Sequence, residues 1–297
     1  MQQLRGQPSQ AAPVNAPPEW LHRLERLRLL TRERLGRGAL AVQPLPGVEI
    51  APGLQRVQAR VSGIKLRLAG LDLPSGLKPP WHEGPMVERS ELLLFDTETS
   101  GLCGGTGLKV FMLGLLYWDT DAWVLTQYLL TRPEGEGALV RSWMQACAER
   151  RCLVSYNGRR FDVPAMRTLQ ILHGAGELAA GIDHWDLLYP VRRAFRGSWS
   201  DCRLATAEQQ LLKRVRQHDL PGSEAPRAWR DFLARGDTHD LLRVLAHNRT
   251  DLESLLGILR ALQNDVRTAP KLRAPSRAQR LAMPVLSPSL PLALDWR

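Results

Sequence analysis

The stretch LLLFDTE at residues 92–98 decides the fold, because it joins a continuous apolar run to two acidic residues. Four consecutive large apolar residues are typical of a central strand that is buried on both faces. Side chains alternate along a strand, so Asp96 and Glu98 should face the same side of the sheet. Like charges at the end of a buried strand repel each other and lose hydration, and a divalent cation would offset both costs.

The segments that follow indicate a mixed α/β sheet covered by helices. Residues 110–118 and 123–131 predict two strands joined by a hairpin turn at residues 119–121, and short strands are expected at residues 152–155 and 182–186. Helices are expected at residues 137–151, 161–173, 187–216, 229–233 and 241–262. Three antiparallel strands are thus followed by alternating helices and strands, which adds parallel strands to the sheet.

The distribution of charge separates this core from its flanks. The 297 residues carry a net charge of +10, of which residues 1–90 contribute +6 and residues 263–297 contribute +4, whereas residues 91–262 hold 21 basic and 21 acidic residues. We expect disorder at residues 1–18, an N-terminal helix at residues 19–36 with a small β region up to residue 89, a core domain at residues 90–264, and a basic, Pro-rich tail at residues 265–297.

Composition also excludes some classes of protein. No window approaches the ~18 apolar residues that a membrane span needs, and the N-terminus has no basic-then-apolar signal segment. The four cysteines stand singly, which favours free thiols over a disulfide framework. We therefore expect a cytoplasmic protein that is not inserted in a membrane.

Two further acidic residues stand where an acid is locally unexpected. Asp162 lies at a turn between a predicted strand and a predicted helix, and Asp251 lies inside the helix expected at residues 241–262. His247 precedes Asp251 by four residues and therefore shares its helix face. Taken alone, an Asp at the start of a helix is usually a helix cap, and a His–Asp pair four residues apart is usually a solvated contact. A cluster of hard oxygen ligands with few nitrogens and no paired thiols favours Mg²⁺ or Mn²⁺ over Zn²⁺.

Order, spacing and neighbours give these residues a family resemblance that covers residues 92–262. The segments that carry it are FDTETSGLCGGTG (95–107), NGRRFDVP (157–164) and HNRTDLESL (247–255), with DHWD (183–186) and LPGSEAP (220–226) as further matches. In these segments the chain resembles the DEDD exonucleases of the ribonuclease H-like superfamily, and within them the YprB-like bacterial branch. The resemblance implies a ribonuclease H-like mixed sheet and a site for two divalent cations, Mg²⁺ or Mn²⁺.

The resemblance also implies the roles of individual residues. The metal-binding carboxylates, which are also catalytic, would be Asp96, Glu98, Asp162 and Asp251. In the family, a His or Tyr before the last Asp positions or deprotonates the attacking water. Here His247 stands four residues before Asp251, the spacing of the Tyr type rather than the five of the His type. Histidine titrates near neutral pH, which suits a general base, but a structural or substrate-orienting role for His247 stays open.

Residues beside the carboxylates would contact the substrate in the same family. The candidates for substrate binding are Thr97, Thr99, Leu102, Asn157 and Arg159. A turn role for Asn157 is slightly favoured because Gly158 follows it, and Arg159 is as well explained as solvated surface. We expect Phe161 to lie in the core and Asp186 to have a structural role.

Three readings of the function follow from the resemblance. The first is a metal-dependent 3′–5′ exonuclease that acts on single-stranded ends of DNA or RNA by a two-metal mechanism. The second is a structure-specific endonuclease on the same fold, with the basic flanks gripping phosphates. The third is a non-catalytic nucleic-acid-binding module. The choice between RNA and DNA, the protein partners and the oligomeric state are not encoded in any of these motifs.

Overall fold

The computed structural model describes residues 43–61, 73–101, 109–178, 181–216 and 219–269. The chain divides into two compact units, residues 1–44 and 45–297, and every described helix and strand lies in the second unit. The predictions for residues 1–18, for the helix at 19–36 and for the tail beyond residue 269 lie outside the described residues. Within the described ranges, no helix is long and apolar enough to cross a bilayer.

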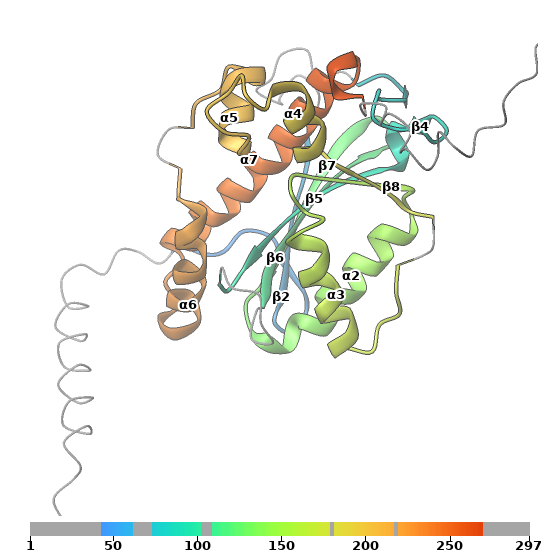
Figure 1. Cartoon of the computed structure of the whole chain (residues 1–297). Coiled ribbons are helices and arrows are strands. Elements are labelled where there is room, and N and C mark those ends of the chain that lie inside the picture. Colours follow the sequence, from blue (N-terminus) through green and yellow to red (C-terminus); the bar gives the residue numbers. More distant parts are fainter. Residues whose placement is uncertain (1–42, 62–72, 102–108, 179–180, 217–218, 270–297) are drawn as a thin grey trace, which may run out of the picture. The chain divides into compact units, whose positions relative to one another are not determined.

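A seven-stranded mixed sheet forms the centre of the second unit, in the order β1-β2-β7-β6-β5-β8-β9 (Figure 1). Its strands are β1 (Val48–Ala51), β2 (Leu54–Val61), β5 (Leu92–Thr99), β6 (Val110–Asp119), β7 (Ala122–Leu130), β8 (Cys152–Ser155) and β9 (Asp183–Asp186). Strands β5, β6 and β7 pair antiparallel, whereas β8 and β9 continue the sheet parallel to β5. The mixed sheet expected from the sequence is confirmed. The strands before residue 62 extend this same sheet, because β2 pairs with β7.

The apolar run of β5 is buried on both faces, as its composition predicts. Leu92 and Leu94 pack in a core with α4 (Leu188–Phe195) and the second half of α7 (His239–Leu262), while Leu93 and Phe95 pack in a second core with α2 (Glu136–Ala148) and α3 (Asp162–Leu172). Figure 1 shows α2 and α3 together on one side of the sheet and the long helix α7 crossing the other side. The two faces of β5 therefore lead to two different sets of helices.

The segment at residues 187–216 differs from the continuous helix that its sequence predicts. It contains α4, then an irregular stretch, then α5 (Leu204–Ala207) and the π-helix η3 (Glu208–Leu212). Gly197 in the irregular stretch has a φ of 98° and Lys213 after η3 has a φ of 54°, and such left-handed backbone interrupts a right-handed helix. The other elements are β3 (Gly76–Leu77), β4 (Val87–Glu88), α6 (Ala225–Arg235), and the 3₁₀ helices η1 (Arg89–Glu91), η2 (Pro133–Gly135), η4 (Gly222–Glu224) and η5 (Val266–Thr268).

Candidate functional site

The end of β5 presents Asp96 and Glu98 on the face of the sheet that α7 covers. Both residues share the face of Leu94, since side chains alternate along the strand. In the neighbouring strand, Asp96 lies opposite Gly114 and Glu98 lies opposite Met112. Glu98 is 8% exposed, and it accepts no hydrogen bond from any described residue. The strand pattern therefore places two carboxylates side by side, as the sequence predicts.

Asp162 reaches the same end of β5 from the first turn of α3. Its Oδ1 accepts hydrogen bonds from the backbone N–H of Thr97 at 3.0 Å and from the Thr97 hydroxyl at 2.5 Å. The turn before α3 is tight, with Asn157 at a φ of 67°. A Cβ on Gly158 would lie 2.4 Å from Ser155 Oγ, so glycine is required for the chain to pass over β8 and deliver Asp162.

Asp251 arrives from the middle of α7, with His247 one turn earlier. His247 Nε2 lies 3.5 Å from Asp251 Oδ2. Asn248 lies on the same side of this helix and is completely buried. Its amide Nδ2 donates to Asp96 Oδ2 at 2.9 Å, and its Oδ1 accepts from Gln127 Nε2 at 2.8 Å. Asn248 thus ties α7 to both β5 and β7.

We call Asp96, Glu98, Asp162 and Asp251 the acidic cluster. Burial raises the pKa of all four carboxyl groups above their usual values. Repulsion from Asp251 and Asp162 adds to the increase in the pKa of both Asp96 and Glu98. For Asp162 the hydrogen bonds from Thr97 oppose burial, and for Asp251 the charges of His247 and Arg216 do so. The members of the cluster therefore lie near enough to destabilise one another's charge.

Arg216 places a guanidinium group against the acidic cluster. It donates through Nη2 to Asp251 Oδ1, and its Nε and Nη2 bind the two carboxylate oxygens of buried Glu208 at 2.8 and 2.5 Å. Its Nη1 donates to Asp219 Oδ2 at 3.0 Å. Burial alone lowers the pKa of Arg216, but the hydrogen bond to Glu208 and the charge of Asp251 outweigh burial and raise it. Arg216 is therefore charged and stabilises the ionised form of Asp251.

Carboxylate oxygens are the donors that Mg²⁺ and Mn²⁺ prefer, so the chemistry of the acidic cluster fits a divalent cation. A cation would also relieve the repulsion that raises the pKa values. In the part of the chain that the structure describes, no three His, Cys, Asp or Glu side chains already stand in a metal-binding arrangement. Asp162 is engaged by Thr97 and Asp251 by Arg216. We therefore expect Asp251 to exchange Arg216 for a cation on binding.

The residues expected to contact substrate have different local contacts in the structure. Thr97 supports Asp162, and the Thr99 hydroxyl donates to Gly101 O at 3.0 Å. Asn157 occupies the tight turn and donates its backbone N–H to an Asp186 oxygen at 2.7 Å. Leu102 lies outside the described residues.

Arg159 and Asp186 hold this turn together through hydrogen bonds. The exposed Arg159 donates its guanidinium to the His184 carbonyl and its backbone N–H to Asp186. Asp186 also accepts the backbone N–H of Leu188 at 3.2 Å, so its carboxylate holds the turn together. The expectation that Phe161 lies in the core is wrong, because its side chain is 56% exposed. Phe161 directly precedes α3, where the chain leaves the sheet, and it does not share the helix face that Met166 and Leu169 bury.

Sequence reasoning missed the polar residues that surround the acidic cluster: Gln127, Glu208, Arg216, Asp219 and Asn248. Asn248 carried a usable signal, since it lies three residues before Asp251 in the predicted helix and shares its face. Arg216 and Asp219 carried none. They lie in an irregular connection between η3 and α6, where no periodicity indicates the direction of a side chain.

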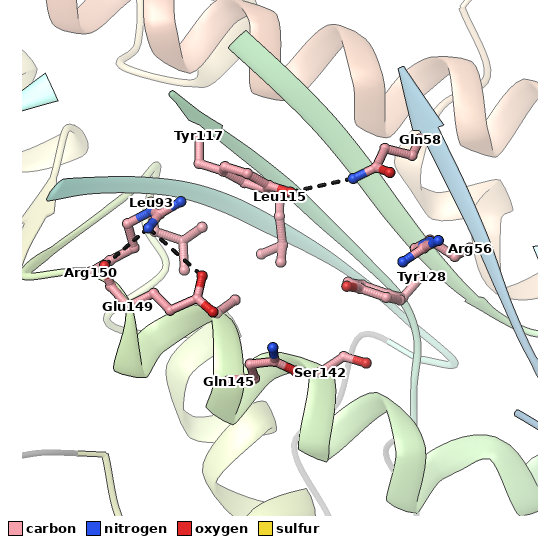
Figure 2. Close-up of a pocket in the computed structure, with 11 residues that line it drawn as sticks. Arg56, Gln58, Leu93, Leu115, Tyr117, Tyr128, Ser142, Gln145, Glu149 and Arg150 are labelled. Carbon is pink, nitrogen blue, oxygen red and sulfur yellow. Dashed lines mark hydrogen bonds and ion pairs between the residues drawn. The ribbon is translucent and has the colours of Figure 1, made fainter. Parts of the chain in front are cut away.

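A separate cavity of about 200 Å³ lies on the opposite face of the sheet, between β2, β6, β7 and α2. Figure 2 shows Tyr117, Tyr128 and Leu93 lining it from the strands, with Arg150 at one end. Leu93 shares the β5 face of Phe95, not that of Asp96 and Glu98. This cavity is therefore distinct from the acidic cluster.

Several known proteins are similar to this chain. A sequence model described as the RNase H superfamily matches residues 93–263, more than half of the chain. The uncharacterized protein YprB from Bacillus subtilis (strain 168) is 33% identical over 171 residues, which span 57% of this chain and 41% of that protein. The structure of the family B DNA polymerase from the hyperthermophilic archaeon Pyrobaculum calidifontis gives a TM-score of 0.46 at 16% identity, covering 60% of this chain and 27% of that chain. The sequence model and YprB confirm the part of the resemblance that concerns a YprB-like protein with a ribonuclease H-like fold.

Proposed function

The chain belongs to the RNase H superfamily, and on that premise we propose that it is a metal-dependent nuclease that acts as a 3′–5′ exonuclease on single-stranded ends of DNA or RNA. The observation that carries the proposal is the acidic cluster, in which three separate elements bring carboxylates together at the end of β5. Burying like charges costs stability unless a ligand compensates them. A phosphodiester brings further negative charge and requires cations between itself and the carboxylates.

Asp96, Glu98, Asp162 and Asp251 would hold two divalent cations, Mg²⁺ or Mn²⁺. When bound, these ions supply stabilisation of the attacking and leaving oxygens in an in-line displacement. The chain contributes the orientation of its carboxylates. Asn248 fixes one oxygen of Asp96, and Thr97 fixes one oxygen of Asp162. Side chains held by hydrogen bonds need no reorganisation during the reaction.

In this proposal, His247 would accept a proton from the attacking water. Its ring stands beside Asp251 in α7, with Nε2 directed toward that carboxylate. Proton transfer to a positioned base contributes about 10²–10⁴-fold to a rate. The residues we propose for contact with the terminal nucleotides are Thr97, Thr99, Leu102, Asn157 and Arg159.

A second candidate, a non-catalytic nucleic-acid-binding module, is favoured by one observation. Arg216 already compensates the charge of Asp251, so part of the acidic cluster is stable without a cation. In that case the cluster would have a role in folding alone.

Cleavage of end-labelled oligonucleotides distinguishes these functions. Single-stranded DNA and RNA, labelled separately at the 5′ and 3′ ends, are incubated with the protein and Mg²⁺, Mn²⁺ or EDTA. We expect a cation-dependent ladder that shortens from the 3′ end and that Asp96→Asn abolishes. Asp121→Asn, the same change in the exposed β6–β7 turn, is the matched control and should leave the ladder intact. Large internal fragments would indicate an endonuclease, and binding without cleavage would indicate the non-catalytic module.

A further inference from the structure

Asp219 pairs with the side of His247 that faces away from Asp251. His247 Nδ1 lies 2.9 and 2.8 Å from the two Asp219 oxygens, while Nε2 lies 3.5 Å from Asp251 Oδ2. The His247 and Asp219 side chains are 15% and 27% exposed, respectively, so both are largely withdrawn from water. Asp219 directly precedes Leu220, which is buried in the core that contains α6. The pair is therefore held by packing and not only by its own contact.

The contacts of Nδ1 determine which ring nitrogen carries the proton. Arg216 Nη1 also approaches Nδ1, at 3.3 Å, and a guanidinium can only donate. An ionised Asp219 can only accept, so Nδ1 cannot satisfy both neighbours at once. The contact with Asp219 is about half an ångström shorter, and Arg216 Nη1 has a better acceptor in Asp219 Oδ2 at 3.0 Å. The arrangement is consistent only if Nδ1–H donates to Asp219.

In the neutral ring, this assignment leaves Nε2 with a free lone pair. At 3.5 Å, Nε2 and Asp251 Oδ2 are too far apart for a strong hydrogen bond. The lone pair is therefore directed toward the acidic cluster, and no strong hydrogen bond to Asp251 occupies it. Without Asp219, both remaining neighbours would favour the other tautomer, since Arg216 would donate to Nδ1 and Asp251 would accept from Nε2–H.

We propose that Asp219 is a positioning residue that holds His247 in the Nδ1–H tautomer and turns Nε2 toward Asp251 as a proton acceptor. The tautomer follows from the contacts alone. The use of Nε2 as the base in phosphodiester hydrolysis rests on the proposed function. A carboxylate that orients a histidine in this way acts through the ring and does not touch the substrate.

The test reads the tautomer directly by NMR. The full chain is labelled with ¹⁵N-histidine, His247 is assigned among the seven histidines by its loss in His247→Gln, and long-range ¹H–¹⁵N spectra are recorded with EDTA at a pH where the ring is neutral. We expect the Nδ1–H form in the wild type, the Nε2–H form in Asp219→Ala and recovery of Nδ1–H in Asp219→Glu. Asp231→Ala, which removes the ion pairs of Asp231 with Arg227 and Arg235 within α6, should not alter the signal. A wild-type Nε2–H form, or an Asp219→Ala variant that keeps Nδ1–H, would overturn the assignment.

Kinetics then separate the positioning role from the proposed function. On the oligonucleotide that the wild type cleaves, Asp219→Ala should lower kcat by about 10²-fold or more, as expected for loss of an oriented base, with KM within about threefold and partial recovery in Asp219→Glu. An unchanged kcat would refute the role in catalysis. A wild type that is inactive on all substrates would refute the proposed function, whereas the tautomer would still be decided by the NMR spectra. Urea unfolding of each variant shows whether lost activity reflects lost structure.

Discussion

Gly114 of β6 lies against the side chain of Asn248 from α7, and adding a single methyl group there should disturb the acidic cluster. Gly114 stands opposite Asp96 in β5 and opposite Gln127 in β7. A Cβ at this position would lie 2.1 Å from Asn248 Oδ1 and 2.8 Å from its Cγ and Nδ2. Asn248 has no room to retreat, because it is fully buried and hydrogen-bonded on both sides.

The cost of Gly114→Ala has two parts. Overpacking of a close-packed interior costs about 1–3 kcal/mol. If Asn248 moves to relieve the clash, Asp96 loses a buried donor, and a buried group left without its partner costs about 1–3 kcal/mol. Gln127 keeps its other hydrogen bond, from Nε2 to Leu245 O at 2.8 Å. We therefore expect the variant to lose about 2–6 kcal/mol of unfolding free energy.

Urea denaturation in EDTA measures this loss, with an unchanged m-value as the sign that the unfolding transition is the same. Gly176→Ala is the matched control, since a Cβ there meets nothing within 4 Å, and it should change stability by less than about 0.5 kcal/mol. In the double variant Gly114→Ala/Asn248→Ala the clash disappears, so the two losses should be non-additive by at least about 1 kcal/mol. A loss below about 1 kcal/mol for Gly114→Ala alone would show that Asn248 is not held as described.

Three other variants test the electrostatics of the site and its surroundings. Arg216→Gln removes the guanidinium that compensates Asp251, so we expect the unfolding free energy in EDTA to fall by about 3–5 kcal/mol. Adding Mn²⁺ should raise the Tm of this variant by more than it raises the Tm of the wild type. An equal rise would contradict the exchange of Arg216 for a cation. Glu98→Gln removes a buried like charge and should raise the Tm in EDTA while weakening Mn²⁺ binding in calorimetry, and unchanged binding would remove Glu98 from the ligand set. Burial, with the charge of Arg159, lowers the pKa of His184 to about 4. An unfolded chain therefore binds the proton first, and stability that is complete above pH ~6.5 should fall by roughly 3 kcal/mol as the pH drops toward 4. Urea titrations at several pH values should show that His184→Asn removes this part of the pH dependence. Identical pH profiles for the variant and the wild type would show that His184 does not cause it.

The sequence predicted those parts of the site that regular structure places. Alternation along the run at residues 92–98 set Asp96 and Glu98 on one face, and helical spacing set His247 beside Asp251. The same patterns predicted the mixed sheet, because strands and long helices have characteristic periods. They failed at residues 187–216, where left-handed backbone at Gly197 and Lys213 ends helices that composition alone would continue.

Arg216 and Asp219, two of the polar residues that surround the acidic cluster, were not predictable, because irregular backbone positions them as well. Arg216 lies in an irregular connection, and its direction depends on a bidentate contact with Glu208, eight residues earlier. Such a contact depends on the tertiary path of the chain and leaves no local period in the sequence. A neutral charge balance over residues 91–262 indicated only that basic residues compensate the acids somewhere in this domain.

The way in which the carboxylates are held distinguishes them from a chance gathering of acids. Burial of like charges lowers the stability of the folded state, as the raised pKa values of Asp96 and Glu98 show. Protein side chains offset part of that cost, and the same contacts orient the carboxylates. The amide of Asn248 donates to one carboxylate oxygen of Asp96 and not to the other. Glu98 is compensated least, since its carboxylate accepts no hydrogen bond among the described residues. The charge of Arg216 lowers its pKa by less than burial and the repulsion of Asp251, Asp162 and Asp219 each raise it. A cluster whose members are oriented, yet incompletely neutralised, is the arrangement in which a cation gains the most binding energy. Residues that destabilise the fold yet are held in fixed orientations are typical of functional sites.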